Sequence, residues 1–425
     1  MPRSIIKKTK LLRPVIKPKR KAGKVKPLRP VIKPKRKAGR VKLIDPFAHL
    51  RPNITIKIEP VQLGKATFLP LAANASNKKG STKIVLRLEL LNKTNKALKV
   101  NSINFSFPNS KHPTIIMKDK EFGKRLTILR QLFWSNRRLN ISKSNTPKLY
   151  DNAIYLKGPA PKRVQVNVYC KGKSHPATKL VGLKAHKNDV NKNSYSFPFS
   201  AADLMLSQFC VTKADHKYTG GAGATQMFAH DITVQRVKLK SKKWTPLKAH
   251  ENVSLNKNED HGIWNLPVRA MANGTVQEFL NTMKDNTKMG KPKPAPKPVF
   301  GNYLKIKHGK ELVTYSHFKK GSIPKSLLKK GARVREGQII GLGGNSGNSS
   351  GPHLHIHVIH NSSEALRPFL YRDAWTIQKN KLSLGSTISK WTQLKGHGIP
   401  FEDTVVWPNS SANMLKMLLH VMSNF

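Results

Sequence analysis

The sequence has few acidic residues, almost no cysteine and no long apolar run. Of its 425 residues, 79 are Lys or Arg and only 21 are Asp or Glu, which gives a formal net charge of +58. Two cysteines, Cys170 and Cys210, exclude a disulfide-rich scaffold and a cysteine-based zinc module, and the sequence leaves open whether they pair. Since no run of about 18 apolar residues is present, no transmembrane segment is expected.

The basic N-terminus is not followed by an apolar segment, so no ordinary secretory signal is expected. The compartment stays open, because association with a virus particle and release by a non-standard route both agree with this sequence. So large an excess of positive charge indicates a polyanionic partner. Nucleic acid, an acidic wall polymer and a membrane surface all qualify, and the charge does not choose among them.

The first 44 residues contain a tandem repeat. The segment LRPVIKPKRKAGKVK at Leu12–Lys26 recurs with one substitution at Leu28–Lys42, and residues 1–44 hold 18 Lys or Arg and no acid. Because prolines interrupt the basic clusters and like charges repel, we expect a disordered tail that binds a polyanion. The remaining positive charge predicts a basic surface on the folded part as well.

Residues 45–205 alternate apolar and polar residues in the way that is typical of half-buried strands. Two groups of apolar residues each fall on one strand face: Ile84, Leu86, Leu88 and Leu90, and then Ile103, Phe105 and Phe107. The pattern predicts an antiparallel β domain, for which an immunoglobulin-like sandwich is the best match.

Residues 206–370 change to short strands that are rich in glycine and histidine. The segment Met289–Phe300 (MGKPKPAPKPVF) is interpreted as a long loop within this part, since strand-like segments flank it. Residues 371–425 are expected to pack on it and to contain a helix at Ser411–Met422. The sequence therefore predicts a mainly β chain: a disordered tail at 1–44, a sandwich-like accessory domain at 45–205, an antiparallel β domain at 206–370 and a C-terminal extension at 371–425.

The strongest motif is GPHLHIHV at Gly351–Val358, which follows a glycine-rich segment. Side chains alternate along a strand, so the residues between the histidines enter the core. Three histidines then share one face, which we expect to be wet: His353, His355 and His357. Histidines at i and i+2 have Cα atoms roughly 7 Å apart, so one can bind a metal ion while the other reaches a metal-bound water.

Two further strand-like segments bring candidates to this site. Alternation in Glu311–Phe318 places His317 on a common face with Val313 and Tyr315, and His317 is a candidate to join the histidines. In Met227–Val234, the same rule places Asp231 toward the site and the neighbouring His230 toward the core. In a chain so poor in acids, a carboxylate within an apolar strand is a candidate ligand.

In this order, the motifs of residues 214–370 resemble those of the lysostaphin-type zinc endopeptidases, which cut peptide bonds in bacterial peptidoglycan. The segments that carry the resemblance are LPVRA at Leu266–Ala270, NGTV at Asn273–Val276, GNYLKIKHG at Gly301–Gly309, YSHF at Tyr315–Phe318, VREGQIIG at Val334–Gly341 and GPHLH at Gly351–His355.

The resemblance implies a lysostaphin-type fold for residues 206–370 and a zinc ion (Zn2+) bound by Asp231 and His355. It further implies that His317 and His353 are catalytic histidines that do not bind the metal. One would take a proton from the water, and the other would stabilise the developing oxyanion.

The compact H-x-x-x-D segment that usually supplies the first zinc ligand is absent here. His216, 15 residues before Asp231, is the candidate for that ligand, and His230 and His261 are the alternatives. His357 stands where the family often has an acid, so it is either a residue that contacts a ligand or a solvent-facing one.

The sequence therefore predicts a zinc metalloendopeptidase that hydrolyses peptide bonds in peptidoglycan cross-links by a metal-activated water. Two alternatives stay open. One is a catalytically degenerate protein that keeps the peptidase fold and serves as a binding module. The other is a structural component, for example of a virus particle, that associates with nucleic acid through its basic surface.

Overall fold

The computed structural model describes residues 54–59, 61–62, 65–72, 80–92, 98–118, 126–127, 139–141, 148–172, 175–214, 228–237, 244–245, 255–363, 366–382, 387–399, 404–409 and 411–423. The chain divides into two units at residues 1–51 and 52–425, and all described residues belong to the second. The tail at residues 1–44 lies outside them, so its disorder and its polyanion binding stay predictions. No helix of the described part is long and apolar enough to cross a membrane.

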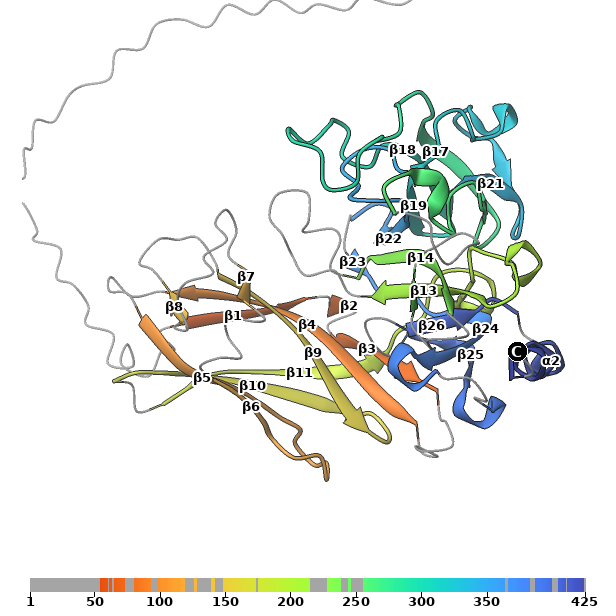
Figure 1. The fold of residues 1–425 in the computed structure, drawn as a ribbon. Coiled ribbons are helices and arrows are strands. Elements are labelled where there is room, and N and C mark those ends of the chain that lie inside the picture. Colours follow the sequence, from red (N-terminus) through yellow and green to blue (C-terminus); the bar gives the residue numbers. More distant parts are fainter. Residues whose placement is uncertain are drawn as a thin grey trace, which may run out of the picture. The chain divides into compact units, whose positions relative to one another are not determined.

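The described strands up to residue 185 pair into one 11-stranded sheet (Figure 1). Its strands are β1 (Ile54–Glu59), β2 (Val61–Gln62), β3 (Lys65–Leu71), β4 (Ser81–Asn92), β5 (Leu98–Ser106), β6 (Ile115–Lys118), β7 (Leu126–Thr127), β8 (Leu139–Ile141), β9 (Lys148–Lys157), β10 (Arg163–Cys170) and β11 (Ala177–Ala185). The predicted alternation is confirmed, because the apolar residues named above on β4 and on and after β5 are all buried.

The pairing of this sheet differs from the immunoglobulin-like arrangement that the sequence suggested. Its main path runs β6-β5-β10-β11-β3-β4-β9-β7, so the described strands form one continuous hydrogen-bonded network rather than two separate sheets. β11 also pairs with β3 in parallel. Strand alternation is a local property and predicted the strands, but it contains no information on which strands pair.

The described strands from residue 195 onward form a 13-stranded sheet and a small two-stranded one. The larger sheet holds β12 (Tyr195–Ser196), β13 (Gln208–Ala214), β14 (His230–Val237), β15 (Trp244–Thr245), β17 (Gly274–Leu280), β18 (Asn302–His308), β19 (Glu311–Phe318), β20 (Arg333–Val334), β22 (Leu354–His360), β23 (Leu366–Arg367), β24 (Tyr371–Gln378), β25 (Thr392–His397) and β26 (Thr404–Trp407). The smaller sheet pairs β16 (Pro267–Arg269) with β21 (Ile339–Leu342).

Helical structure in the described residues is sparse, and the mainly β class is confirmed. The helix α2 spans Ala412–Ser423, close to the predicted helix. Single 3-10 turns occur at Asn191–Asn193, Ala201–Asp203, Asn258–Asp260, Lys325–Leu327, Lys379–Lys381 and Ile388–Lys390. Both cysteines, Cys170 and Cys210, are buried, and no disulfide bond joins them.

The main path of the larger sheet runs β12-β24-β26-β13-β14-β22-β19-β18-β17-β20. Strands β24 to β26 of the predicted C-terminal extension thus belong to the same sheet as β14, β22 and β19. The last strand of the first sheet ends at Ala185, and the first strand of the larger sheet begins at Tyr195. The domain division as a whole stays a prediction.

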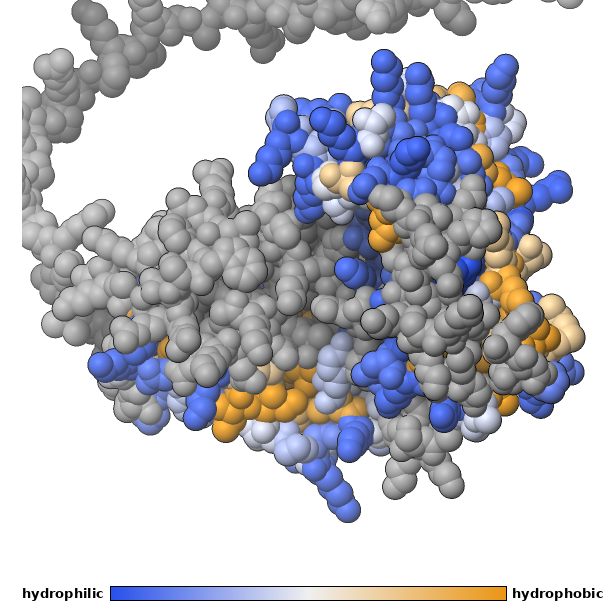
Figure 2. All heavy atoms as spheres, viewed as in Figure 1, coloured by the Kyte–Doolittle hydropathy of each residue, from blue (hydrophilic) through white to orange (hydrophobic). Residues whose placement is uncertain are grey.

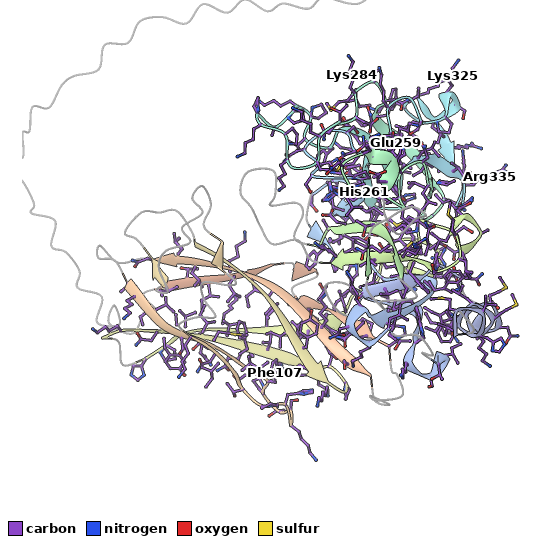
Figure 3. The ribbon with its side chains drawn as sticks, in the orientation of Figure 1. Phe107, Glu259, His261, Lys284, Lys325 and Arg335 are labelled. Atoms are coloured by element: carbon purple, nitrogen blue, oxygen red, sulfur yellow. The ribbon has the colours of Figure 1, made fainter. Side chains whose placement is uncertain are left out.

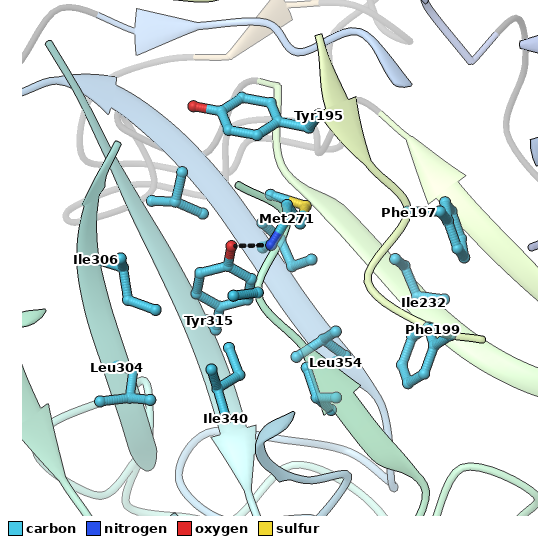
Figure 4. Packing of buried hydrophobic residues seen from close by; sticks show 14 of the residues in the cluster. Tyr195, Phe197, Phe199, Ile232, Met271, Leu304, Ile306, Tyr315, Ile340 and Leu354 are labelled. Carbon is cyan, nitrogen blue, oxygen red and sulfur yellow. Dashed lines mark hydrogen bonds between the residues drawn. The ribbon is translucent and has the colours of Figure 1, made fainter. Parts of the chain in front are cut away.

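One face of the larger sheet is covered by a continuous apolar core (Figure 4). Side chains from four neighbouring strands meet in it: Ile232 on β14, Leu354 and Ile356 on β22, Val313 and Tyr315 on β19, and Leu304 and Ile306 on β18. The Tyr315 hydroxyl accepts a hydrogen bond from the Met271 backbone N–H at 3.0 Å. Burying this face fixes which side chains of the same strands point the other way.

The part of the chain that holds the larger sheet also has a polar surface. Hydrophilic side chains gather over the region of β17, β18 and β21 (Figure 2). The exposed side chains of Lys284, Lys325 and Arg335 point away from the strands there (Figure 3). Basic residues therefore lie on the surface of the folded part, and the partner that they bind stays a prediction.

The buried histidine His308, at the end of β18, makes the stability of this sheet depend on pH. Its Nδ1 lies 2.9 Å from the Asn273 carbonyl oxygen, and its Nε2 lies 3.2 Å from the Tyr315 hydroxyl. Burial lowers the pKa of His308 from 6.5 to about 4. The folded chain therefore keeps this ring neutral in a range where the unfolded chain protonates it.

We predict that the free energy of unfolding falls as the pH is lowered from 6.5 toward 4, since the unfolded state binds more protons in this window. His308 alone accounts for about 3 kcal/mol of this fall. The variant His308→Gln, which cannot titrate, should flatten the dependence in urea unfolding measured at several pH values. An unchanged slope in this variant would contradict the assignment.

Candidate metal-binding site

The candidate site lies on the face of the larger sheet that is opposite to its core. In the antiparallel pair of β14 and β22, Asp231 stands opposite His355, and in the pair of β22 and β19, His355 stands opposite Ser316. Directly opposite residues project to the same side of a sheet. The register therefore gathers polar side chains from three strands at one place.

Asp231 is in contact with two of the predicted histidines. The His355 Nδ1 lies 2.9 Å from the Asp231 Oδ1, and the His353 Nε2 lies 3.6 Å from the same oxygen. His230 points the other way, as predicted: its Nδ1 is 3.3 Å from the Tyr371 hydroxyl, and its ring packs on an aromatic ring of the core. This orientation rules out His230 as the alternative ligand.

His317 reaches the site in a way that strand alternation did not predict. The expectation that it shares a face with Val313 and Tyr315 is wrong, because those two residues lie in the core. The pairing of β18 with β19 shifts by one residue there, so that His317 is left unpaired in a bulge, and its φ is +66°. A bulge re-aims a side chain, and here it turns the His317 ring to 4.6 Å from that of His353, centroid to centroid.

Backbone carbonyls fix the orientation of both histidine rings. The His317 Nδ1 lies 2.7 Å from the Ser346 carbonyl oxygen, and the His353 Nδ1 lies 2.8 Å from the Gly351 carbonyl oxygen. A carbonyl can only accept, so each Nδ1 carries a proton, and in a neutral ring the Nε2 then presents a lone pair. Burial, followed by the neighbouring His353 and His355, holds the pKa of His317 well below its usual value, so His317 is neutral at neutral pH.

The sequence suggested that His353, His355 and His357 share a wet face, whereas in the structure only His353 and the neighbouring Asp231 are partly exposed. His355 and His357 are only 3% and 4% exposed. The Phe300 ring covers both, with centroids 6.3 Å from the His355 ring and 5.2 Å from the His357 ring. Phe300 ends the long loop that begins after β17, and nothing in the strand pattern of β22 could reveal a cover that comes from another part of the chain.

The donor types and their spacing fit zinc as far as the described residues extend. Two ligands of a tetrahedral zinc ion lie about 3.3 Å apart, so the Asp231 Oδ1 and the His355 Nδ1 need to separate by only a few tenths of an ångström. Within the described ranges, no group of three or more His, Cys, Asp or Glu side chains is arranged to hold a metal ion. Asp231 and His355 thus form a pair that needs a further ligand.

The two remaining candidates for the further ligand are His216 and His261. His216 lies outside the described residues, so its role stays a prediction. His261 lies near the motif, with its Cε1 3.9 Å from the position of a Cβ built on Gly351, but its Nε2 is 3.3 Å from the Leu255 carbonyl oxygen (Figure 3 labels His261).

Two contributors to the site were missed in the sequence. In the sequence, Phe300 stands out only as the end of the loop at Met289–Phe300, and Ser346 only as part of a glycine-rich segment. The buried Ser316 hydroxyl is a third feature, since it has no hydrogen-bond partner among the residues that the structure describes. The one available signal was the position of Phe300 directly before the GNYLKIKHG segment.

Part of the chain matches a known protein family. Residues 250–368 match Peptidase family M23. A segment of 63 residues is 48% identical to the peptidoglycan DD-endopeptidase ShyA of Vibrio cholerae, covering 15% of this chain and 14% of that protein. A segment of 69 residues is 42% identical to an uncharacterized metalloprotease of Haemophilus influenzae, covering 16% of this chain and 13% of that protein. The matches thus span about a seventh of these curated relatives.

Solved structures of similar proteins were also found. The catalytic domain of the antimicrobial peptidase lysostaphin from Staphylococcus simulans is 19% identical, with a TM-score of 0.20 over 41% of this chain and 88% of that one. A zinc-containing peptidase from Vibrio cholerae is 16% identical, with a TM-score of 0.21 over 66% of this chain and 83% of that one.

We predict that Gly301→Ala disturbs the site through Ser346. Gly301 has a φ of +65°, and a Cβ added there would lie 2.4 Å from the carbonyl group of Ser346 that orients His317. Gly321 has a similar φ of +74° and open space around it, so Gly321→Ala is the matched control. The control should lose about 1–2 kcal/mol of stability, and Gly301→Ala clearly more, in urea unfolding. Equal losses would contradict this reading.

Proposed function

Since residues 250–368 form a domain of Peptidase family M23, we propose that this chain is a zinc metalloendopeptidase that hydrolyses peptide bonds in peptidoglycan cross-links. The observation that carries the proposal is the convergence of one carboxylate and three imidazoles on a single face of the sheet. His355 and His353 both approach the Asp231 Oδ1, and His317 lies against His353.

Asp231 and His355 are the residues of the described part that would hold the zinc ion, and His216 would complete the set. Two neutral imidazoles and one carboxylate leave zinc with a net positive charge and an open position. When bound, zinc lowers the pKa of a water molecule and polarises the scissile carbonyl. No serine or cysteine nucleophile is then needed.

His317 is the residue best suited to accept the proton of the water. Its Nδ1–H is held by the Ser346 carbonyl, so its Nε2 lone pair is available, and its lowered pKa keeps it neutral. A general base has to be unprotonated at the working pH. His353 is then the histidine that remains to stabilise the negative charge of the oxyanion. Because its Nδ1–H is held by the Gly351 carbonyl, His353 would do so through an Nε2–H, in the form that carries a proton on both ring nitrogens.

The substrate part of the proposal is supported by the names of the relatives. ShyA and ShyB of Vibrio cholerae are named peptidoglycan DD-endopeptidases, and each is similar to a segment of 63 residues of this chain. A peptide of the bacterial wall is accordingly the first substrate to test.

We predict about one zinc ion per chain in the purified wild-type protein, with digestion of peptidoglycan by the same sample. The variant His216→Ala should lose zinc and digestion together, because it removes the proposed third ligand. The control is His360→Ala, which removes a partly exposed histidine at the far end of β22 and should keep both.

Zinc content by elemental analysis separates the outcomes of this test. Absence of zinc from wild-type protein, even after reconstitution, would overturn the proposed function and favour a binding role for the fold. Zinc and digestion that both survive His216→Ala would leave the metalloendopeptidase in place and exclude His216 as a ligand.

We predict that His317→Asn lowers the rate of hydrolysis by roughly 10²–10⁴-fold while the zinc content stays at the wild-type level. Asparagine tolerates the positive φ at this position, so the bulge should persist. Steady-state kinetics on a soluble cross-linked peptide should show the loss in kcat. A parallel loss of zinc would mean that His317 is a ligand instead of the base.

A further inference from the structure

The third histidine of the motif has a contact that the proposed chemistry does not use. The His357 Nδ1 lies 3.1 Å from the His355 Nε2, which is within hydrogen-bond distance. The other nitrogen of the same His355 ring, Nδ1, faces the Asp231 carboxylate at 2.9 Å. His355 is therefore held from both sides, by Asp231 at one ring nitrogen and by His357 at the other.

We propose that His357 is a positioning residue that holds His355 in the tautomer able to bind zinc. This inference rests on the proposed zinc site. The His355 nitrogen on the side of Asp231 has to offer a lone pair to a metal ion, so a neutral His355 ring carries its proton on Nε2. The Asp231 carboxylate can only accept, so before a metal ion binds it favours the opposite tautomer, with the His355 proton on Nδ1. In the tautomer that binds zinc, the His355 Nε2–H would donate to the His357 Nδ1 at the observed distance of 3.1 Å, and His357 would carry its own proton on Nε2.

Burial strengthens the hydrogen bond between the His355 Nε2 and the His357 Nδ1. Both rings are buried, and Phe300 covers the two of them, so bulk water does not compete for the His355 Nε2. A hydrogen bond in such a place is stronger than one in water, and an unpaired N–H would be costly there. Outer partners of this kind fix the orientation of a metal-binding imidazole and raise its basicity.

The position of His357 on β22 also agrees with this role. His355 and His357 are two apart on β22, and on a strand this spacing puts their side chains next to each other on one face. The intervening Ile356 is fully buried in the core and locks the strand against rotation. The geometry thus follows from the strand itself and needs no loop.

The test compares two nearly isosteric variants of the full-length protein, His357→Asn and His357→Leu. The Asn Oδ1 takes the place of the His357 Nδ1 as an acceptor, whereas Leu fills the space under Phe300 without one. The zinc dissociation constant is measured by competition with a chromophoric chelator. We expect His357→Leu to bind zinc about 10–100-fold more weakly than wild type and His357→Asn to recover most of the affinity.

Several outcomes distinguish this inference from the proposed function. If wild-type protein binds zinc and His357→Leu binds it as tightly, the positioning role is overturned and the zinc site stands. If wild-type protein binds no zinc, the proposed function fails and this inference fails with it. Zinc binding that is weakened equally in His357→Asn and His357→Leu also overturns the role. The loss would then come from removal of the imidazole ring and not from removal of the acceptor.

Thermal unfolding of the metal-free variants is the control for a purely structural effect. Such an effect would lower the stability of the variants, and His357→Asn would not recover zinc affinity. If His357→Leu does not fold, His357→Gln replaces it, because its longer side chain moves the amide away from the Nδ1 position. Weaker zinc binding by His357→Gln than by His357→Asn is then the expected result, and equal binding overturns the role.

Discussion

Asp231 and His355 meet because β14 and β22 pair in the one register that sets them opposite each other. A shift of either strand by one residue would turn the side chain of that strand to the other face of the sheet and separate the pair. The register is fixed by the core on the far side, where Ile232 lies opposite Leu354 and both are buried. Hydrophobic burial under the sheet thus determines that Asp231 and His355 gather above it.

Loops complete the site by covering the face that the strands create. The Asn286 side chain donates hydrogen bonds to the carbonyl oxygens of Gly347 and Ser349, at 2.9 and 3.2 Å, and the Asn348 backbone N–H donates to the Val299 carbonyl oxygen at 2.8 Å. These bonds tie the loop that ends in Phe300 to the glycine-rich segment that orients His317. The result is a buried polar site, in which each hydrogen bond counts for more than it would in water.

Side-chain alternation predicted the site well wherever a strand is regular. It placed Asp231 and His230 on opposite faces of β14, and His355 and His357 on one face of β22 together with His353 directly before it, as the structure has them. It failed at His317, because a bulge breaks the period of two there. It also failed for the exposure of the histidines, because the cover comes from Phe300, and for the pairing of the first sheet, because β11 and β3 are far apart along the chain.

The sequence by itself determined the mainly β class, the strands of the motif and the residues whose chemistry suits a zinc peptidase, because alternation and residue type are local properties of the chain. The tertiary structure alone decided that Asp231 meets His355, that the bulge turns His317 toward His353, and that Phe300 closes the face over His355 and His357. Each of these contacts joins residues from different strands or loops, and such contacts exist only once the packing of the core has fixed the register of the sheet.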